Sequence, residues 1–367
     1  MKKNYLIKVP LKESPSTILI GKNILKKFKK KIFNEIKNSK KIFIITDKSI
    51  QKFHLKKIIN IIPKNINVKT VIINPGEKMK NMNTVNKILL FILKNKISRN
   101  DALFALGGGV IGDISGFVAS IALRGIKLVH FPTTLLAQVD SSIGGKTGVN
   151  NKYGKNLIGT FYQPNLIVCD TSFLATLPKR QLIAGYAEVI KYSIIDDIRF
   201  FDWLKKNTKK ILLNDDSAII EIVKKSVMIK RKFVLKDEKD LKNQRALLNF
   251  GHTFGHSLEK CSKYSNNLLH GEAVSIGICM ASKLSNISGF LSFDNYLKIK
   301  NIFSEFGLPI DLNFLKKLKI KKKNVLKNMI YDKKNLNGKL HFVLCKNIGK
   351  AFVYNKVKTK FLEKSIN

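Results

Sequence analysis

The stretch that decides the fold runs from Leu103 to Asn150 and reads LFALGGGVIGDISGFVASIALRGIKLVHFPTTLLAQVDSSIGGKTGVN. It opens as an apolar run, breaks at the three consecutive glycines 107–109, and continues with apolar residues at helical spacing. This order predicts a strand, a tight turn and the start of a helix. Such a turn lets backbone N–H groups approach a phosphate, and the helix offers its positive end to that charge. A pyrophosphate site is one interpretation, although similar turns also join strands to helices in proteins that bind no nucleotide.

The second half of the stretch is dense in small polar residues, which cannot build a core. They are Thr133, Thr134, Gln138, Asp140, Ser141, Ser142, Gly144, Gly145, Lys146 and Thr147. Lys146 follows two glycines that would let a ligand come close. A solvated loop is the alternative. Charge argues against that alternative, because residues 101–150 hold three basic and three acidic side chains in a chain of net charge +43.

The composition bounds the possible partners. A length of 367 residues allows two domains, and a hydrophobic content of 44% supports a sizeable core. The 68 Lys and Arg residues against 25 Asp and Glu would ordinarily indicate nucleic acid or an anionic surface. The lysines are instead spread over many predicted helices and loops, together with abundant Ile, Asn and Phe, which favours compositional drift at tolerant surface positions. We therefore expect no nucleic acid partner, although an anionic substrate would gain from the positive field.

Cysteine usage and the N-terminal sequence indicate the compartment. Cys169, Cys261, Cys279 and Cys345 lie far apart and form no CxxC pair, which is typical of reduced thiols in a cytosolic protein. The N-terminus has no apolar core of secretory length, and no uncharged apolar run approaches the roughly 18 residues of a spanning helix. We expect a soluble, cytoplasmic protein with no membrane partner.

Short apolar runs that alternate with helical segments predict the architecture of the first part. Two strands are expected within residues 1–21, and further strands at 41–46, 68–73, 101–106, 127–131 and 166–169. This alternation predicts a mostly parallel sheet covered on both faces, with ligands at the carboxyl ends of its strands. Four candidate turns fall at such ends, namely 75–80, the triple glycine, 133–134 and Asp170.

The pattern changes near residue 177. From Pro178 to about residue 326 nearly every segment has helical periodicity, and LHFVLC and AFVYN near the end predict a small hairpin. We therefore expect an α/β N-terminal nucleotide-binding domain of Rossmann-like type over residues 1–177. An all-α domain with a small β-hairpin is expected over residues 178–367.

Three histidines in one short span form a second candidate site. His252 and His256 stand four residues apart and would share a helix face, and His270 opens the next helical segment. Glu188 is the one acid in an otherwise apolar helix, so its charge needs a partner. Imidazoles with one carboxylate make a plausible zinc site with a position left open for substrate. Histidines on a helix are also often only hydrogen-bonded to neighbours, and the spacing leaves both interpretations open.

Other residues near the histidines refine this picture. Thr253 stands where an HExxH metalloprotease motif has glutamate, so that class is excluded. Gly251 and Gly255, which are poor helix formers, directly precede two of the histidines and indicate a close approach there. Lys191 lies three residues beyond the candidate carboxylate and on the same helix face.

Taken together, these motifs resemble the 3-dehydroquinate synthase family over nearly the whole chain. Separately, several of them are shared by other sugar-phosphate cyclases. The matching motifs are PGEK at 75–78, GGGVIGD at 107–113, RG at 124–125, PTTLLAQVDSSIGGKTGVN at 132–150, GKNLIGTFYQP at 154–164, AEVIKY at 187–192, RALLNFGHTFGH at 245–256 and HGEAV at 270–274.

The resemblance implies NAD, one divalent metal ion (zinc or cobalt), a cleft between the two domains and a homodimer. It implies the metal ligands Glu188, His252 and His270. The NAD-binding positions that it implies are Pro75, Gly76, Glu77, Lys78, Met79, Lys80, Gly109, Val110, Ile111, Gly112, Asp113, Thr133, Thr134, Lys146, Lys155, Phe173, Leu174, Ala175 and Thr176. The implied substrate contacts are Asp140, Lys146, Asn156, Lys191, Lys230, Arg245, Asn249, His256, Lys333, Lys334 and, reaching across from a second subunit, Arg124.

The activity implied is the conversion of 3-deoxy-D-arabino-heptulosonate 7-phosphate to 3-dehydroquinate and phosphate. It proceeds by transient oxidation with NAD, β-elimination of phosphate, re-reduction and an intramolecular aldol closure. The stretch 237–244 departs from the family pattern in composition and length, so Lys230 and Arg231 stay alternatives for one contact. A related cyclase, or a metal-dependent alcohol or glycerol-phosphate dehydrogenase of the same architecture, is the alternative activity.

Overall fold

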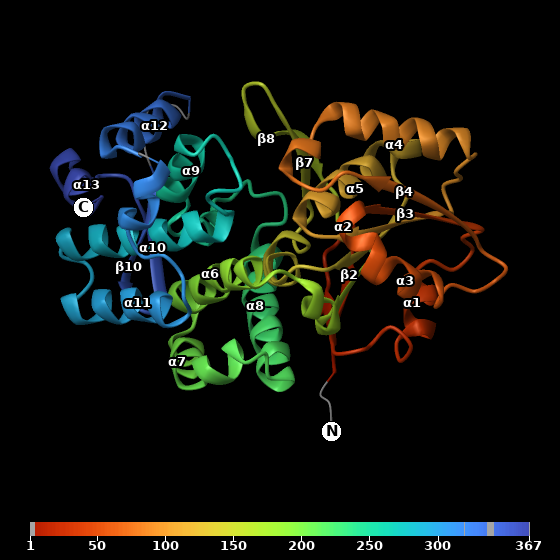
Figure 1. Cartoon of the computed structure of the whole chain (residues 1–367), viewed down its shortest axis with the longest axis horizontal. Helices are drawn as coiled ribbons and strands as arrows, with labels where there is room; N and C mark the ends of the chain where they lie inside the picture. The colour runs from red at the N-terminus through yellow and green to blue at the C-terminus, as the bar shows by residue number, and fades with distance from the viewer. Residues whose placement is uncertain (1–3, 319, 336–340, 367) are drawn as a thin grey trace. The chain divides into compact units, whose positions relative to one another are not determined.

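The computed structural model describes residues 4–318, 320–335 and 341–366, with the backbone alone for residues 330–335 (Figure 1). These residues form two compact units. The first consists of the chain up to Pro178 together with Ile219–Lys239. The second consists of Lys179–Ala218 together with the residues from Asp240 onward.

A seven-stranded sheet is the centre of the first unit, and its strand order is β1-β2-β9-β6-β5-β3-β4. Only β1 pairs antiparallel within this sheet, with β2, and all the other pairings are parallel. The mostly parallel sheet expected from the sequence is therefore confirmed. The strands are β1 (Tyr5–Val9), β2 (Ser16–Gly21), β3 (Lys41–Asp47), β4 (Asn67–Ile73), β5 (Ala102–Gly107), β6 (Lys127–Pro132) and β9 (Leu166–Asp170).

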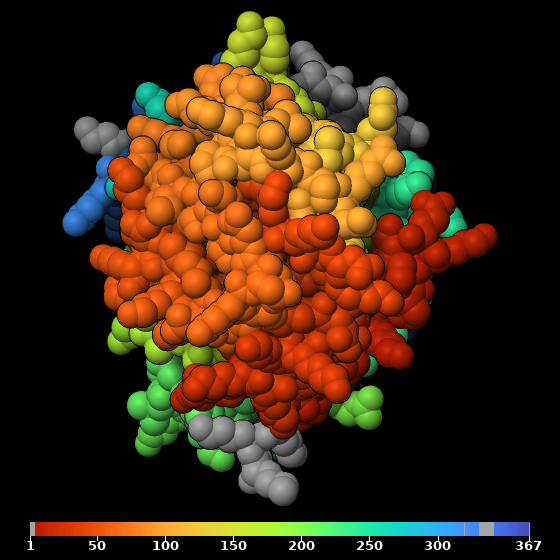
Figure 2. All heavy atoms as spheres, turned by 90° about the vertical axis from the view of Figure 1, so that its right-hand side faces the viewer, coloured from red at the N-terminus to blue at the C-terminus, as the bar shows by residue number. Residues whose placement is uncertain are grey.

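Helices cover both faces of this sheet because its central strands are apolar on both sides. Along β5, Phe104 packs into one core cluster with Ile32 of α1 (Lys29–Glu35), as alternation along a strand requires. Leu103 packs into the other cluster with Ile88 of α4 (Met82–Lys94). Figure 1 shows these two helices on opposite sides of the sheet, and Figure 2 shows how the first part of the chain, coloured red to orange, covers one side of the unit.

The remaining helices in the part of the first unit before Pro178 are short, apart from α5. They are α2 (Lys48–Ile50), a π-helical turn (Gln51–Leu55), α3 (Lys56–Ile59), α5 (Gly109–Ile121), a second π-helical turn (Ala137–Ser141) and 3₁₀ turns at Glu77–Met79, Ala122–Arg124 and Thr171–Thr176.

A separate hairpin is formed by β7 (Lys146–Asn151) and β8 (Gly154–Phe161), where the sequence predicted no strand. The small residues there allow two backbones to approach closely. A Cβ on Gly159 would lie 2.0 Å from the carbonyl oxygen of Thr147, and one on Gly148 would lie 2.6 Å from that of Ile158. The glycines therefore serve strand pairing as well as any ligand.

The second unit is helical, as expected, and it is built around α10 (His270–Ile287), most of which is buried. It includes the small hairpin of β10 (Phe342–Asn347) and β11 (Lys350–Tyr354) that the sequence predicted. The other helices are α6 (Lys179–Asp196), α7 (Ile198–Leu212), α9 (His252–Cys261), α11 (Phe293–Glu305), α12 (Lys322–Asn335), α13 (Thr359–Ser365) and 3₁₀ turns at Gln244–Asn249 and Leu312–Leu318. No helix in the described ranges is long and apolar enough to cross a membrane.

Helix α8 (Asp216–Lys236) departs from the continuous second domain expected at residues 178–367, because most of it belongs to the first unit. Its lysine and arginine side chains contact the edge strand β1 of the first unit. Lys224 Nζ lies 4.7 Å from the centre of the Tyr5 ring, and Arg231 donates to the carbonyl of Lys8 at 2.6 Å.

Candidate functional site

The candidate turns of the first unit lie at one edge of its sheet. Strands β4, β5, β6 and β9 end at Ile73, Gly107, Pro132 and Asp170, and each of the turns expected from the sequence follows directly or begins at that residue. Because these strands are parallel, their carboxyl ends meet at the same edge. The structure therefore brings together segments that are far apart in the sequence.

The glycine turn at this edge leads directly into α5. Gly108 is extended and Gly109 is the first helical residue, so the N-terminal N–H groups of a 13-residue helix face outward from the turn. A Cβ on Gly108 would lie 3.0 Å from Thr134, and one on Gly109 would lie 3.1 Å from Ser141 Oγ. Side chains would therefore crowd this turn. Its shape fits the pyrophosphate of a dinucleotide bound at the helix N-terminus.

Beside the turn, Lys80 contacts Asp113, an expected cofactor position, and Asn156, an expected substrate contact. Its buried ammonium group forms an ion pair with Asp113 and donates to Asn156 Oδ1 at 2.5 Å. Burial raises the pKa of Asp113, and the charge of Lys80 opposes that rise. Asn150 links Glu77 to the same group, because its Nδ2 donates to Glu77 Oε1 at 2.8 Å and its backbone N–H donates to the Lys80 carbonyl at 2.8 Å.

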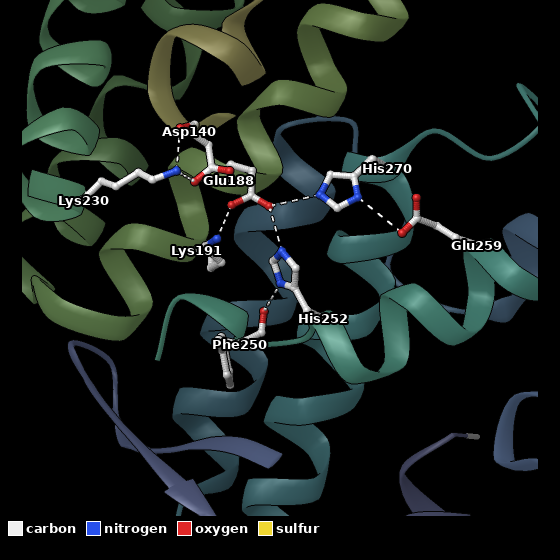
Figure 3. A network of polar contacts seen from close by, with 8 residues as sticks. All are labelled: Asp140, Glu188, Lys191, Lys230, Phe250, His252, Glu259 and His270. Carbon is white, nitrogen blue, oxygen red and sulfur yellow. Dashed lines mark hydrogen bonds and ion pairs between the residues drawn. The ribbon is translucent and has the colours of Figure 1, made fainter. Parts of the chain in front are cut away.

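The pair Asp140 and Lys230 distinguishes the two candidates left open on α8. Lys230 Nζ donates to Asp140 Oδ1 at 2.7 Å and to the Asp140 carbonyl at 2.5 Å (Figure 3). Arg231 instead binds the carbonyl of Lys8. The structure therefore groups Lys230, and not Arg231, with another expected substrate contact.

The other expected cofactor positions differ in exposure. Thr133 and Phe173 are buried, whereas Lys146, Ala175 and Thr176 are exposed. His54, which was not among the predicted residues, contacts two of these positions: its Nε2 lies 2.7 Å from Thr176 Oγ1, and its ring centre lies 4.7 Å from that of Phe173. A single histidine in a lysine-rich helical segment gave no signal of this contact.

In the second unit, three side chains converge from three helices (Figure 3). Glu188 comes from the middle of α6, and His252 and His270 are the first residues of α9 and α10. Gly251, in the left-handed conformation with φ of 78°, sets the start of α9. His252 Nε2 lies 3.4 Å and His270 Nε2 3.6 Å from Glu188 Oε1, and the three potential ligand atoms all lie within 4.8 Å of one another.

This geometry fits a divalent cation. Ligand atoms that surround zinc tetrahedrally at 2.0–2.1 Å are separated from one another by about 3.4 Å. Glu188 is 0% exposed, and a buried carboxylate requires positive charge. Burial alone would raise the pKa of Glu188, but the Lys191 ammonium, which forms an ion pair with it, and the two imidazoles hold that pKa well below its ordinary value. One carboxylate and two imidazoles form a donor set typical of catalytic zinc sites.

The outward nitrogens of both imidazoles also have partners. His252 Nδ1 lies 3.2 Å from the carbonyl oxygen of Phe250, and His270 Nδ1 lies 3.4 Å from Glu259 Oε2. Metal-binding histidines commonly direct their second nitrogen at such groups. Glu259 was not among the predicted residues, although it follows His252 by seven residues in α9 and therefore lies on the same helix face.

The remaining expected substrate contacts lie at several places. The His256 ring centre is 5.3 Å from that of His252, Arg245 is buried, and Asn249 is exposed. Arg124 has a left-handed backbone with φ of 64°. Lys333 and Lys334 fall in α12, and their side chains lie outside the described residues.

Sequence comparisons identify relatives along the whole chain. Models of the 3-dehydroquinate synthase family match residues 70–184 for the N-terminal part and 185–335 for the C-terminal part. The 3-dehydroquinate synthase of Pelagibacter ubique (strain HTCC1062) is 44% identical over 362 residues, which cover 98% of this chain and 96% of that protein. The corresponding enzyme of Thermodesulfovibrio yellowstonii is 43% identical over 362 residues, which cover 98% of this chain and 99% of that protein.

Solved structures of the same fold include two synthases that bind NAD⁺ and a metal ion. A 2-epi-5-epi-valiolone synthase from Streptomyces hygroscopicus subsp. jinggangensis 5008, with NAD⁺ and Zn²⁺ bound, superposes with a TM-score of 0.86 at 26% identity, covering 97% of this chain and 96% of that chain. A 2-deoxy-scyllo-inosose synthase in complex with carbaglucose-6-phosphate, NAD⁺ and Co²⁺ gives a TM-score of 0.87 at 23% identity, with 99% of each chain covered. The second likeness is one of fold alone.

Proposed function

The chain belongs to the 3-dehydroquinate synthase family, and from that premise we propose which of its residues carry out the reaction. It is a lyase that converts 3-deoxy-D-arabino-heptulosonate 7-phosphate to 3-dehydroquinate and phosphate in aromatic amino acid biosynthesis, with NAD and one divalent metal ion. When bound, NAD supplies a reversible hydride acceptor and the metal ion a Lewis acid for substrate hydroxyls.

Glu188, His252 and His270 would hold the metal ion, and their convergence is the observation that carries the proposal. Only a site with a ligand position left open can also bind substrate hydroxyls, and three protein ligands leave one open in tetrahedral geometry. Phe250 and Glu259 keep the imidazoles oriented through their outward nitrogens.

The first turn of α5, from Gly109 to Asp113, would bind the pyrophosphate of NAD through backbone N–H groups. Lys80 holds Asp113 in place, and the hydrogen bond from Asn150 fixes Glu77 beside it. The segments 133–134 and 173–176 and the lysines at 146 and 155 complete the proposed cofactor contacts.

The substrate carries a phosphate and a carboxylate, and cationic side chains suit both groups. Lys146, Lys191, Lys230 and Arg245 are the proposed contacts for these anions, with Asn156, Asn249 and His256 for hydroxyls. These side chains position the substrate. They need not accept a proton, because the phosphate group of the substrate, held beside the acidic C–H bond, can itself accept that proton while the phosphate leaves. Two of these cations are already paired with carboxylates, Lys191 with Glu188 and Lys230 with Asp140, which fixes where they point.

The stoichiometry of the reaction tests the proposal. With the heptulosonate phosphate and catalytic amounts of NAD, the purified enzyme should release phosphate with every turnover while net NADH stays at zero. An alcohol dehydrogenase of the same fold would instead accumulate NADH in proportion to turnover. NADH accumulation without phosphate release would contradict the proposal.

We further propose that the enzyme works as a cytoplasmic homodimer in which Arg124 serves the site of a second subunit. The left-handed backbone at Leu123 and Arg124 supports this role, because such strain persists where it has a function. Arg124→Ala and Lys146→Ala should each abolish activity. When equal amounts of the two variants are mixed and exchange subunits, half of the dimers contain one subunit of each variant. Each mixed dimer has one intact site of its two, so the mixture should recover about a quarter of the activity of the unaltered enzyme. A mixture that stays inactive would contradict this arrangement.

A further inference from the structure

His54 is a buried histidine of the first unit to which the proposed reaction gives no role. It is 0% exposed, and it lies in the π-helical turn Gln51–Leu55 of the helical segment after β3. Such turns are rare, and within helices they occur frequently at functional sites. Its side chain reaches the segment after β9, where residues 173–176 are proposed cofactor contacts. The contact joins positions that are 122 residues apart in the sequence.

The segment that His54 contacts is held at both ends. Thr171–Thr176 forms a 3₁₀ turn directly after β9, at the same sheet edge as the glycine turn. Runs of 3₁₀ helix longer than three or four residues are uncommon, so a turn of six residues needs support from side chains. At its start, the Asp170 carboxylate accepts a hydrogen bond from the backbone N–H of Ser172 at 3.0 Å. At its end, His54 Nε2 lies 2.7 Å from Thr176 Oγ1.

The geometry fixes the donor in the contact between His54 and Thr176. The Thr176 hydroxyl has one proton and donates it to the carbonyl of Phe173 at 3.1 Å. His54 Nε2 must therefore carry the proton that joins the ring to Thr176. Burial, followed by the charge of Lys57, lowers the pKa of His54 to about 4. The ring is therefore neutral at physiological pH, and its Nδ1 carries no proton.

The second ring nitrogen shows that packing alone does not explain the histidine. His54 Nδ1 is buried and makes no hydrogen bond with any described residue. An unpaired acceptor in the interior costs stability. The ring centre of His54 lies 4.7 Å from that of Phe173, and a phenylalanine could make this aromatic contact without the cost. The hydrogen bond to Thr176 is the feature that a phenylalanine would lack.

We propose that His54 is a positioning residue for the dinucleotide. Its Nε2–H fixes the end of the Thr171–Thr176 turn and thereby holds the exposed residues Ala175 and Thr176 where they receive the cofactor. The imidazole itself touches neither cofactor nor substrate, because it is fully buried. This inference rests on the proposed contact between residues 173–176 and NAD, and it adds a residue on which that contact depends.

The NAD affinity and the stability of a His54→Phe variant test this role together. NAD is titrated calorimetrically into the zinc-loaded enzyme, and the urea midpoint is measured without NAD. The variant should bind NAD about three- to tenfold more weakly, as expected from the loss of one hydrogen bond. Its urea midpoint should be unchanged or higher, because the unpaired Nδ1 is gone and water can replace the imidazole at the exposed Thr176. In turnover, KM for NAD should rise while kcat at saturating NAD stays constant.

A double-mutant cycle shows whether His54 acts through Thr176. Thr176→Val removes the acceptor of the same hydrogen bond, so the double variant should bind NAD no more weakly than Thr176→Val alone. Additive losses would overturn the proposal. Phe53→Leu, at an exposed position of the same π-helical turn, is the control and should bind NAD normally.

Ala175→Trp separates failure of this inference from failure of the proposed function. A bulky ring at this exposed position should weaken NAD binding if the segment contacts the cofactor, whether or not His54 supports the segment. Normal affinity in His54→Phe with weak binding in Ala175→Trp would overturn the inference and leave the proposed cofactor contact intact. Normal affinity in both variants would contradict that contact and the inference with it. A His54→Phe enzyme that does not fold, or that unfolds at a lower urea concentration, would show that the histidine serves stability and would overturn the proposal.

Discussion

Glu188 is fully buried and negatively charged, and its ion-pair partners among the described residues are Lys191, His252 and His270. Removing one imidazole therefore deprives both the carboxylate and the metal ion of a partner. Residue types and spacing predicted a candidate group of Glu188 with three histidines, and the family resemblance implied the set of three ligands within it. The outward partners of the imidazoles escaped prediction, because Phe250 acts through a backbone carbonyl and Glu259 resembles any charged residue near a helix end.

Glu259→Gln should lower the affinity for zinc or cobalt by roughly 10–100-fold. The neutral amide is a weaker hydrogen-bond acceptor than the carboxylate, so it orients the His270 ring less firmly and makes that ring less basic. His252→Ala should abolish metal binding and turnover together while the circular dichroism spectrum is preserved. Metal content is measured by equilibrium dialysis. Glu221→Gln on α8, where the acid forms a partly exposed i,i+3 ion pair with Lys224, is the control and should bind metal normally. A Glu259 variant with the control's affinity would show that the contact has no role.

His130 predicts an acid sensitivity. Burial lowers its pKa from 6.5 to about 4, so the unfolded chain binds the proton more readily in the interval between these values. The free energy of unfolding should therefore fall as pH drops from about 6.5 to 4, at up to about 1.4 kcal/mol per pH unit for this residue. His130→Gln should reduce that slope in urea titrations at several pH values. His341→Gln, an exposed control, should leave it unchanged.

At the scale of elements, the apolar runs predicted five strands of the main sheet to within one residue, and they placed the other two, β1 and β2, only within residues 1–21. Burial on both faces leaves a strong signal in a parallel sheet, because each central strand must be apolar throughout. Strands β7 and β8 were missed because their glycines and polar residues carry no alternating pattern. Their pairing depends on a close backbone approach, which only a neighbouring strand reveals.

The packing of α9 against α10 predicts a large effect of one methyl group. A Cβ on Gly277 would lie 2.2 Å from the carbonyl oxygen of Gly251 and 2.9 Å from the backbone nitrogen of Gly255. Since backbone atoms cannot move aside, Gly277→Ala should lower the free energy of unfolding by about 3 kcal/mol. Ser282→Ala in the same helix is the matched control, and it should change the urea midpoint little. Equal midpoints for the two variants would show that the helices separate without cost.

At the scale of the whole molecule, the net charge of +43 should assist the capture of an anionic substrate. Raising the salt concentration from low to physiological values shortens the screening length to about 8 Å, so KM for the sugar phosphate should rise several-fold while kcat stays constant. Steady-state kinetics in both sodium chloride and potassium glutamate separate screening from competition by chloride. A KM that does not depend on salt would show that the surface lysines play no part in capture.

The two-unit organisation was only partly visible in the sequence. The change of pattern near residue 178 falls at the first break, because the strands of the main sheet end at Asp170 and the next described strand, β10, begins at Phe342. The return of residues 219–239 to the first unit left no such mark, since α8 has the same helical periodicity as its neighbours. Its membership depends on contacts with Tyr5, Lys8 and Asp140, which are remote in sequence.

This return has a consequence for biosynthesis. A ribosome synthesises the chain from its N-terminus, so the first unit cannot complete its folding until residue 239 has been translated and has left the exit tunnel. Until then Asp140 lacks its ion pair with Lys230. A gene fragment that stops at codon 178 would encode an incomplete first unit. The two units of this enzyme are therefore poor candidates for separate expression or for exchange between homologues.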